Sequence, residues 1–195
     1  MSANYGPQLI TLHQDAYLRI AAHVLKHAPL TQKKETWKEV YGMCVGRVVV
    51  GNCIVTDCVP LAVGVHEEVQ LTAMDYVKAA DLETQYALRD PPEFFVGWYH
   101  SHFIGHTFSG VDMENHLGWQ TNLNPHAFGL VFDPALLSKD NPGFCILRLE
   151  NPDLGLASEL EFSDFILKIP KEARSDYIEF LEQHLTEIEF PSREL

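Results

Sequence analysis

Two histidines, a serine and an aspartate lie close together near the middle of the 195-residue chain, at His100, His102, Ser109 and Asp112. His100 and His102 are two positions apart, and side chains at that spacing point to the same face of a β-strand. Two imidazoles and the Asp112 carboxylate can bind a metal ion, and three protein ligands leave the fourth position of a zinc ion open for water. The spacing therefore predicts an open zinc site of the catalytic type.

The residues around this group predict the elements that must position it. Residues 94–99 are apolar and aromatic, which is typical of a buried strand that ends at the histidines. Ser109 followed by Asp112 indicates the start of a helix over about residues 109–120. The same pair is also a capping box that needs no metal, and hydrogen bonds alone can satisfy two strand histidines. Each pair taken separately leaves both explanations open.

The complete pattern resembles the JAMM (MPN+) metalloprotease family. The resemblance rests on His-Ser-His within residues 96–102, on Ser-x-x-Asp at residues 109–112, and on an upstream Glu-Val-x-Gly-x-x-x-Gly block that begins at Glu39. It is strongest to the deubiquitinating metalloprotease subunit of the proteasome lid. The order of predicted elements is similar over roughly residues 8–150.

The chain departs from the family signature directly after the second histidine. Phe103 stands where the signature has a proline, and residues 103–108 form a loop one residue shorter than the signature's. The shorter loop makes His106 a candidate for an additional contact to metal or substrate. Because three ligands already complete the site, we expect that His106 is not a ligand.

The resemblance implies a role for each matching residue. His100, His102 and Asp112 would bind one zinc ion (Zn2+) per chain. Glu39 would act as general base on a zinc-bound water and return the proton to the leaving lysine amine. Ser109 would donate a hydrogen bond to the oxyanion. The implied activity is that of a JAMM zinc metalloprotease, an isopeptidase that removes ubiquitin or a ubiquitin-like protein with a Gly-Gly tail from lysine conjugates.

The resemblance also implies an α/β fold of the MPN/JAMM (cytidine-deaminase-like) type, with a curved, mixed, mostly antiparallel β-sheet flanked by helices. We expect one MPN/JAMM domain over residues 1–195, because a chain of this length with 46% hydrophobic residues suffices for one core. Local patterns predict a helix from Leu12 to before Pro29, a hairpin over 40–61 that turns at Gly51-Asn52, a helix over 74–88, strands over 127–133, 144–150 and 158–168, and a C-terminal helix over about 170–188.

Residues 62–73 connect the predicted hairpin to the helix after it, and in the family an insertion here flanks the active site. Val63, Val65 and Val69 alternate with smaller or polar residues, as in an extended segment that pairs with an incoming peptide. These valines and Phe103 are the expected substrate-binding residues. An ordinary exposed loop is the alternative interpretation.

Composition narrows the classes of partner. A formal net charge of −13, with no basic cluster beyond Lys33-Lys34, argues against nucleic acid and favours a basic or neutral protein surface. The N-terminus lacks the features of a signal peptide, and no stretch reaches the roughly 18 apolar residues of a membrane span. We therefore expect a soluble cytoplasmic protein that does not bind membranes. Its four cysteines lie in apolar runs and are expected to be reduced thiols.

Two other functions fit parts of the pattern. A non-catalytic MPN scaffold subunit is one alternative, although such a subunit is expected to lose ligands that this chain keeps. A mononuclear iron oxygenase is the other, because two histidines and one carboxylate are also the facial triad of those enzymes. Among partners, a proteasome or a second MPN protein is also implied. The chain is short for a lid subunit, so we expect activity alone or with one MPN partner.

Overall fold

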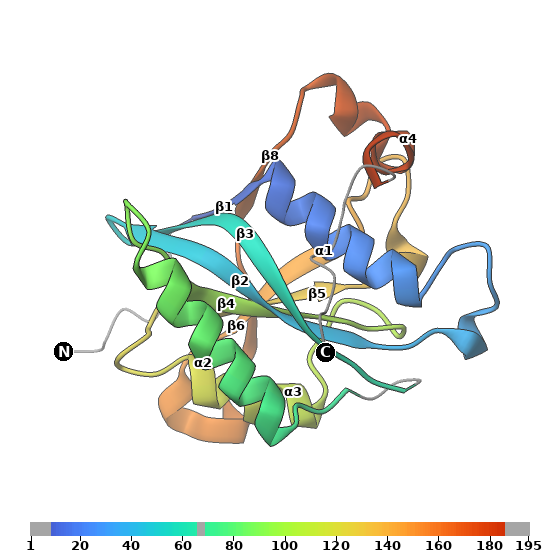
Figure 1. Ribbon diagram of the computed structural model, residues 1–195. Coiled ribbons are helices and arrows are strands. Elements are labelled where there is room, and N and C mark those ends of the chain that lie inside the picture. Colours follow the sequence, from blue (N-terminus) through green and yellow to red (C-terminus); the bar gives the residue numbers. More distant parts are fainter. Residues whose placement is uncertain (1–8, 66–68, 186–195) are drawn as a thin grey trace.

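The computed structural model describes residues 9–65 and 69–185. Its strands form one eight-stranded sheet in the order β7-β6-β5-β4-β2-β3-β1-β8, with helices on both faces (Figure 1). The strands are β1 (Ile10–His13), β2 (Val40–Val49), β3 (Asn52–Val63), β4 (Phe94–Ser101), β5 (Phe128–Phe132), β6 (Phe144–Leu149), β7 (Leu160–Phe162) and β8 (Phe165–Lys168). The α-helices are α1 (Gln14–His27), α2 (Ala73–Ala87), α3 (Gly110–Trp119) and α4 (Tyr177–His184).

The sheet is mixed and mostly antiparallel. The pairs β2 with β3, β2 with β4, β5 with β6 and β6 with β7 are antiparallel. The pairs β1 with β3, β1 with β8 and β4 with β5 are parallel. This arrangement confirms the predicted α/β fold with a curved sheet flanked by helices.

The sheet curls until its two edges are joined by the same stretch of chain. β7 and β8 lie at opposite edges, yet only Ser163 and Asp164 separate them in sequence. The Ser163 amide donates to the Ile146 carbonyl on β6, and the Asp164 carbonyl accepts from the Ile10 amide on β1. Two residues can bridge the edges only because the strong twist of the sheet brings them together.

Each face of the sheet has its own hydrophobic core. One core packs α1 and α4 against residues such as Val40, Cys44 and Tyr99. The other packs parts of α2 and α3 against Tyr41 and Trp98. Neighbouring residues of β2 and β4 thus alternate between the two cores, as successive side chains of a strand do. Figure 1 shows α1 and α2 on opposite sides of the sheet.

The connection from β4 to β5 builds the functional end of the sheet. These two strands are parallel, so the chain must cross over between them, and α3 lies within that crossover. The carboxyl ends of parallel strands, followed by loops and a helix N-terminus, are a common place for ligand sites in α/β folds. The predicted strand through residues 94–99 and the predicted helix near 109–120 are both confirmed.

Several predicted boundaries were wrong. Leu12 and His13, taken as the beginning of the first helix, are the last two residues of β1, and the helix begins at Gln14. The single strand predicted over 158–168 is two strands that pair with different neighbours. The hairpin turns at Val50 and Gly51, which have φ of 50° and 77°, one residue earlier than predicted.

The end of the chain is less regular than its apolar stripe predicted. A short 3-10 helix over Glu172–Ser175 precedes α4, which begins at Tyr177 rather than at Pro170. Residues 186–188 of the predicted helix lie outside the described residues. All four cysteines are buried and free of disulfides. No helix in the described ranges is both long and apolar enough to cross a membrane.

Candidate metal centre

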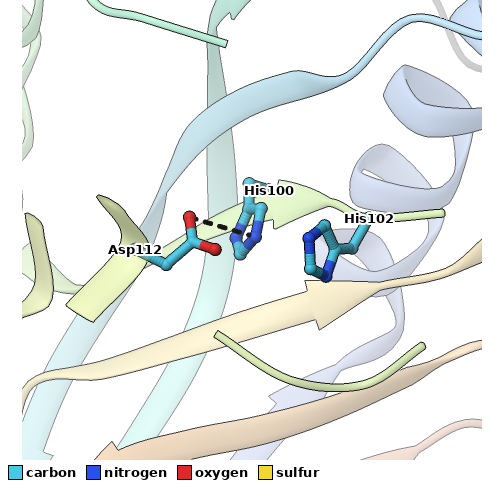
Figure 2. A group of neighbouring side chains, drawn as sticks. All are labelled: His100, His102 and Asp112. Atoms are coloured by element: carbon cyan, nitrogen blue, oxygen red, sulfur yellow. Dashed lines mark ion pairs between the residues drawn. The ribbon is translucent and has the colours of Figure 1, made fainter. Parts of the chain in front are cut away.

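His100, His102 and Asp112 come together where β4 ends and α3 begins. One ligand atom from each residue lies within 4.8 Å of the others. Figure 2 shows the Asp112 carboxylate directed at His100, with His102 beside it. In residues 9–65 and 69–185 this is the one group of its kind. The sequence therefore identified the cluster, and the fold closes it.

The two carboxylate oxygens of Asp112 have different partners. Oδ2 accepts a hydrogen bond of 2.7 Å from the Ser109 amide, and the Ser109 hydroxyl accepts one of 3.2 Å from the Asp112 amide. These two hydrogen bonds form a capping box at the start of α3. Oδ1 lies 3.4 Å from His100 Nε2. The two explanations of Ser109 and Asp112 are therefore compatible, because the cap fixes the carboxylate through one oxygen and directs the other at the histidines.

The surroundings of Asp112 favour its ionised form. Burial raises the pKa of its carboxyl, but the contact with His100 and the hydrogen bonds from Ser109 outweigh burial and lower the pKa to about 2. The position in the first turn of α3 also favours a negative charge, because the positive end of the helix dipole lies there. A carboxylate with so low a pKa is suited to bind a cation.

His102 is oriented by the loop that follows it. Its Nδ1 lies 3.2 Å from the Gly105 carbonyl, so Nδ1 carries the hydrogen and Nε2 is the nitrogen with a lone pair. The Gly105 amide in turn donates to Asp133 at 2.8 Å, at the end of β5. Burial, and then the neighbouring His100, lower the pKa of His102. The neutral imidazole, which binds metals, is favoured.

His100 is held by its environment rather than by hydrogen bonds. Both of its ring nitrogens are buried, and beyond the contact with Asp112 neither has a hydrogen-bond partner among the described residues. Its ring stacks on Trp98 with centroids 4.9 Å apart. A buried, unsatisfied polar group costs about 1–3 kcal/mol. Two imidazoles and a carboxylate fit zinc, and an ion bound among them would give a partner to His100 Nε2, the nitrogen that faces Asp112.

Glu39 approaches from the neighbouring strand. Tyr41 pairs with His100 across β2 and β4, and the two side chains therefore share a face. Glu39 precedes Tyr41 by two positions in extended chain, and its amide and carbonyl pair with Val65 and Gly64 in continuation of the β2–β3 ladder. Alternation places Glu39 on the same face as the histidines. Its side chain is 5% exposed.

The sequence that contains this centre matches a known protein family. The sequence profile of the JAB1/Mov34/MPN/PAD-1 ubiquitin protease family matches residues 6–123, more than half of the chain. This chain belongs to that family. The matched range contains all five residues of the predicted machinery, from Glu39 to Asp112. No curated protein sequence matches the chain.

The expected substrate contacts of this MPN protein are distributed unequally. Val63 at the end of β3 and Val65 just beyond it are exposed, at 38% and 62%. Val69 is partly buried and packs against the core that contains Trp98. Phe103 is 1% exposed and packs on Trp37, so it is unsuited to contact a substrate. Of these four residues, Val63 and Val65 have the most exposed apolar side chains.

His106, the residue considered as an additional ligand, points elsewhere. Its Nε2 lies 3.1 Å from the Gly143 carbonyl, and His106 is not part of the metal-binding group. The structure thus places His106 apart from the group of His100, His102 and Asp112.

The sequence argument missed one residue of the site. Ser101, between the two histidines, is fully buried, and its hydroxyl accepts the Val40 amide at 3.0 Å. Strand alternation was the available signal, because it turns Ser101 away from the face of the histidines and toward the other core. Its partner, 61 positions earlier in the chain, could not be read from local sequence.

Proposed function

We propose that this member of the MPN family is a zinc-dependent isopeptidase that removes ubiquitin or a ubiquitin-like protein from lysine conjugates. The observation that carries the proposal is the group of the buried His100 and His102 with the partly buried Asp112. Their ligand atoms lie within 4.8 Å of one another, and Glu39 lies on the same face of the sheet. Two nitrogens, one oxygen and an adjacent carboxylate are the parts of a hydrolytic zinc site.

When bound to these three ligands, zinc supplies a Lewis acid that polarises a carbonyl and lowers the pKa of water to about 7. Glu39 then acts as general base, taking a proton from the attacking water and delivering it to the lysine amine that leaves. Its burial keeps bulk water away from the proton it carries. Both transfers need hydrogen-bond reach, and the position of Glu39 on the same face of the sheet as the histidines supports this role.

Ser109 has a second role in this proposal. Its hydroxyl oxygen accepts the Asp112 amide as the cap of α3, which leaves the hydroxyl hydrogen to donate toward the carbonyl oxygen of the scissile bond. Donors fixed in advance at a developing oxyanion are worth about 10²- to 10³-fold in rate. The cap thus fixes both the third metal ligand and the donor.

A flexible Gly-Gly tail is the proposed substrate segment. Exposed Val63 and Val65 mark where β3 ends beside Glu39, and an extended peptide can pass there if its side chains are small. We propose that the protein acts alone or with one MPN partner. The protein could also associate with a proteasome while keeping this activity.

The test is cleavage of lysine-linked conjugates of ubiquitin and ubiquitin-like proteins by protein loaded with one equivalent of zinc. Glu39→Gln should lower kcat by at least about a hundredfold, because general base catalysis contributes about 10²- to 10⁴-fold. Glu93→Gln is the matched control, since Glu93 is also a buried glutamate but hydrogen-bonds Thr56 and Arg89, away from the centre. Chelation should abolish activity, and zinc should restore it.

Other outcomes point to the alternatives. A zinc-loaded wild type that cleaves none of the conjugates would favour a non-catalytic MPN scaffold. Iron in protein purified without added metal, together with oxygen-dependent turnover, would favour a mononuclear iron oxygenase. Full activity of Glu39→Gln would contradict the role of Glu39 even if conjugates are cleaved.

A further inference from the structure

The segment that carries Glu39 lies outside regular secondary structure. Residues 37–39 follow a short 3-10 helix and precede the first residue of β2. A general base on such a segment depends on what attaches it, because a displacement of about 1 Å can cost about a hundredfold in rate. The attachments of this segment therefore bear directly on catalysis.

Every backbone amide from Trp37 to Val40 donates a hydrogen bond. The Trp37 amide donates to Lys34, the Lys38 amide to His27 and the Glu39 amide to Val65, each to a backbone carbonyl. The Val40 amide differs, because its acceptor is the side chain of Ser101, at 3.0 Å. One of the four attachments thus depends on a side chain of the strand that carries both histidines.

A second attachment lies on the other side of His102. The Phe103 ring packs edge-on against the Trp37 ring, with centroids 5.4 Å apart and planes at 67°. Both side chains are buried, and they form a small cluster with Ala28. Trp37 Nε1 also donates to the Pro29 carbonyl at 3.0 Å, which fixes the indole. Aromatic pairs of this geometry contribute about 0.5–1.5 kcal/mol beyond their buried area.

We propose that Ser101 and Phe103, the two chain neighbours of His102, are positioning residues that hold the segment Trp37–Val40 against the metal-binding strand and so set the placement of Glu39. Ser101 holds the residue after Glu39, and Phe103 holds the residue two positions before it. Residues 101–103 thereby position both Glu39 and His102. The catalytic part of this inference rests on the proposed isopeptidase function.

This arrangement gives Phe103 a reason to be aromatic. At this position the family signature has a proline, which could not pack a ring on Trp37 in the same way. A large flat side chain fills the space between β4 and the end of α1, where Ala28 and Trp37 lie. The placement of the base therefore depends in this chain on a contact between two large side chains.

The kinetic test compares Ser101→Ala and Phe103→Leu with the wild type. Each should lower kcat by about ten- to a hundredfold while KM and zinc affinity change little, because the base is displaced and the ligands are not. Ser101→Thr, which keeps the acceptor oxygen, should restore most of kcat. In a Glu39→Gln background neither substitution should lower the residual rate further, since residues that act through one group are not additive.

Matched controls remove similar interactions elsewhere. Ser158 is a buried serine whose hydroxyl accepts the Asn151 amide at 3.0 Å, so Ser158→Ala loses the same kind of bond far from Glu39. Phe180 is a buried phenylalanine that stacks on Tyr17 in the core that packs α1 and α4. Phe180→Leu therefore removes a similar aromatic contact and is the control for Phe103→Leu. Both controls should keep the wild-type kcat at a temperature where they are folded.

A second readout is independent of activity. Amide hydrogen exchange of Glu39 and Val40, measured in metal-free protein, should become at least about tenfold faster in Ser101→Ala and Phe103→Leu than in the controls. Unchanged exchange at these two amides would overturn the inference, as would additive losses in the Glu39→Gln background. Faster exchange in a wild-type background that cleaves no conjugate would support the attachment and overturn the proposed function instead.

Discussion

At the scale of single residues, the centre depends on groups that serve two purposes. Asp112 caps its own helix with one oxygen and faces His100 with the other. His102 donates from Nδ1 to Gly105 and so presents Nε2. Such orientation by a second partner typically accounts for about 10- to 100-fold in metal affinity. These contacts thus orient the Asp112 and His102 side chains without a bound ion.

The ligand assignment predicts different behaviour for two nearby histidines. His102→Ala should lose stoichiometric zinc and all activity, because two ligands do not complete the site. His106→Ala should keep one zinc per chain, since His106 bonds the Gly143 carbonyl instead. Metal analysis after dialysis checks both variants. Zinc loss in His106→Ala with zinc retained by His102→Ala would reverse the assignment.

The double role of Ser109 predicts two separable losses. Ser109→Ala should cost about 1 kcal/mol of unfolding free energy through the lost cap of α3, and about 10²- to 10³-fold in kcat through the lost donor. Asp176→Ala is the comparison, because Asp176 caps α4 in the other core. It should lose similar stability but no activity. Denaturant titration and steady-state kinetics measure the two effects, and equal kcat in both variants would rule out the donor role.

At the scale of elements, a buried polar chain fastens α3 to the sheet. Trp98 Nε1 on β4 donates to His116 Nδ1 at 2.9 Å, and His116 Nε2 contacts Gln120 Oε1 at 2.7 Å. Gln120 also exchanges two hydrogen bonds with the backbone of Leu149 on β6. Because α3 carries Asp112, these hydrogen bonds fix Asp112 relative to β4, which leads to both histidines.

The place of His116 in this series of hydrogen bonds predicts that the stability of the fold depends on pH. His116 must be neutral, because Nδ1 accepts from Trp98, and burial lowers the pKa of His116 to about 4. An unfolded histidine titrates near 6.5, so the unfolded state binds more protons between these values and stability falls as pH drops from about 6.5 to 4. The loss is about 3 kcal/mol at most.

Chemical denaturation of metal-free protein at several pH values checks this dependence. His116→Gln keeps an acceptor for Trp98 but cannot titrate, so its unfolding free energy should decline less steeply over the same range. Parallel curves for the two proteins would show that other groups cause the acid sensitivity.

At the scale of the whole molecule, the strands beyond the family match complete the sheet. The profile ends at residue 123, whereas β5, β6, β7 and β8 all begin after it. β5 pairs with β4, the strand that leads to both histidines of the candidate metal centre, and β8 pairs with the outer edge of β1. Leu167, Phe180 and Leu181 pack in the same core as α1. The part of the chain after residue 123 therefore supports the centre that the part before it carries.

A fragment of residues 1–123 should consequently fail to fold. It would leave β4 without its β5 neighbour and would expose one face of α1, a loss far larger than the roughly 5–15 kcal/mol that stabilises a typical domain. Circular dichroism and thermal unfolding of the fragment beside the full chain test this expectation. A cooperative transition and zinc binding in the fragment would contradict it.

Sequence alone determined the parts of this protein that depend on local periodicity. The two-residue spacing of His100 and His102 puts both rings on one face of any strand, and Ser109 with Asp112 caps any helix that starts there. These relations span a few residues and hold whatever surrounds them. They predicted the cluster of His100, His102 and Asp112 and the strand and helix that carry it.

Only the tertiary structure decided the relations between distant segments. Glu39 shares a face with the histidines because β2 pairs with β4 in one register, and Ser101 bonds Val40 across 61 positions. The stretch over 158–168 divides between opposite edges because the sheet curls, and Phe103 is buried because Trp37 lies over it. Pairing register, curl and side-chain contacts between remote segments depend on the packed whole, since no local pattern specifies which strand becomes whose neighbour.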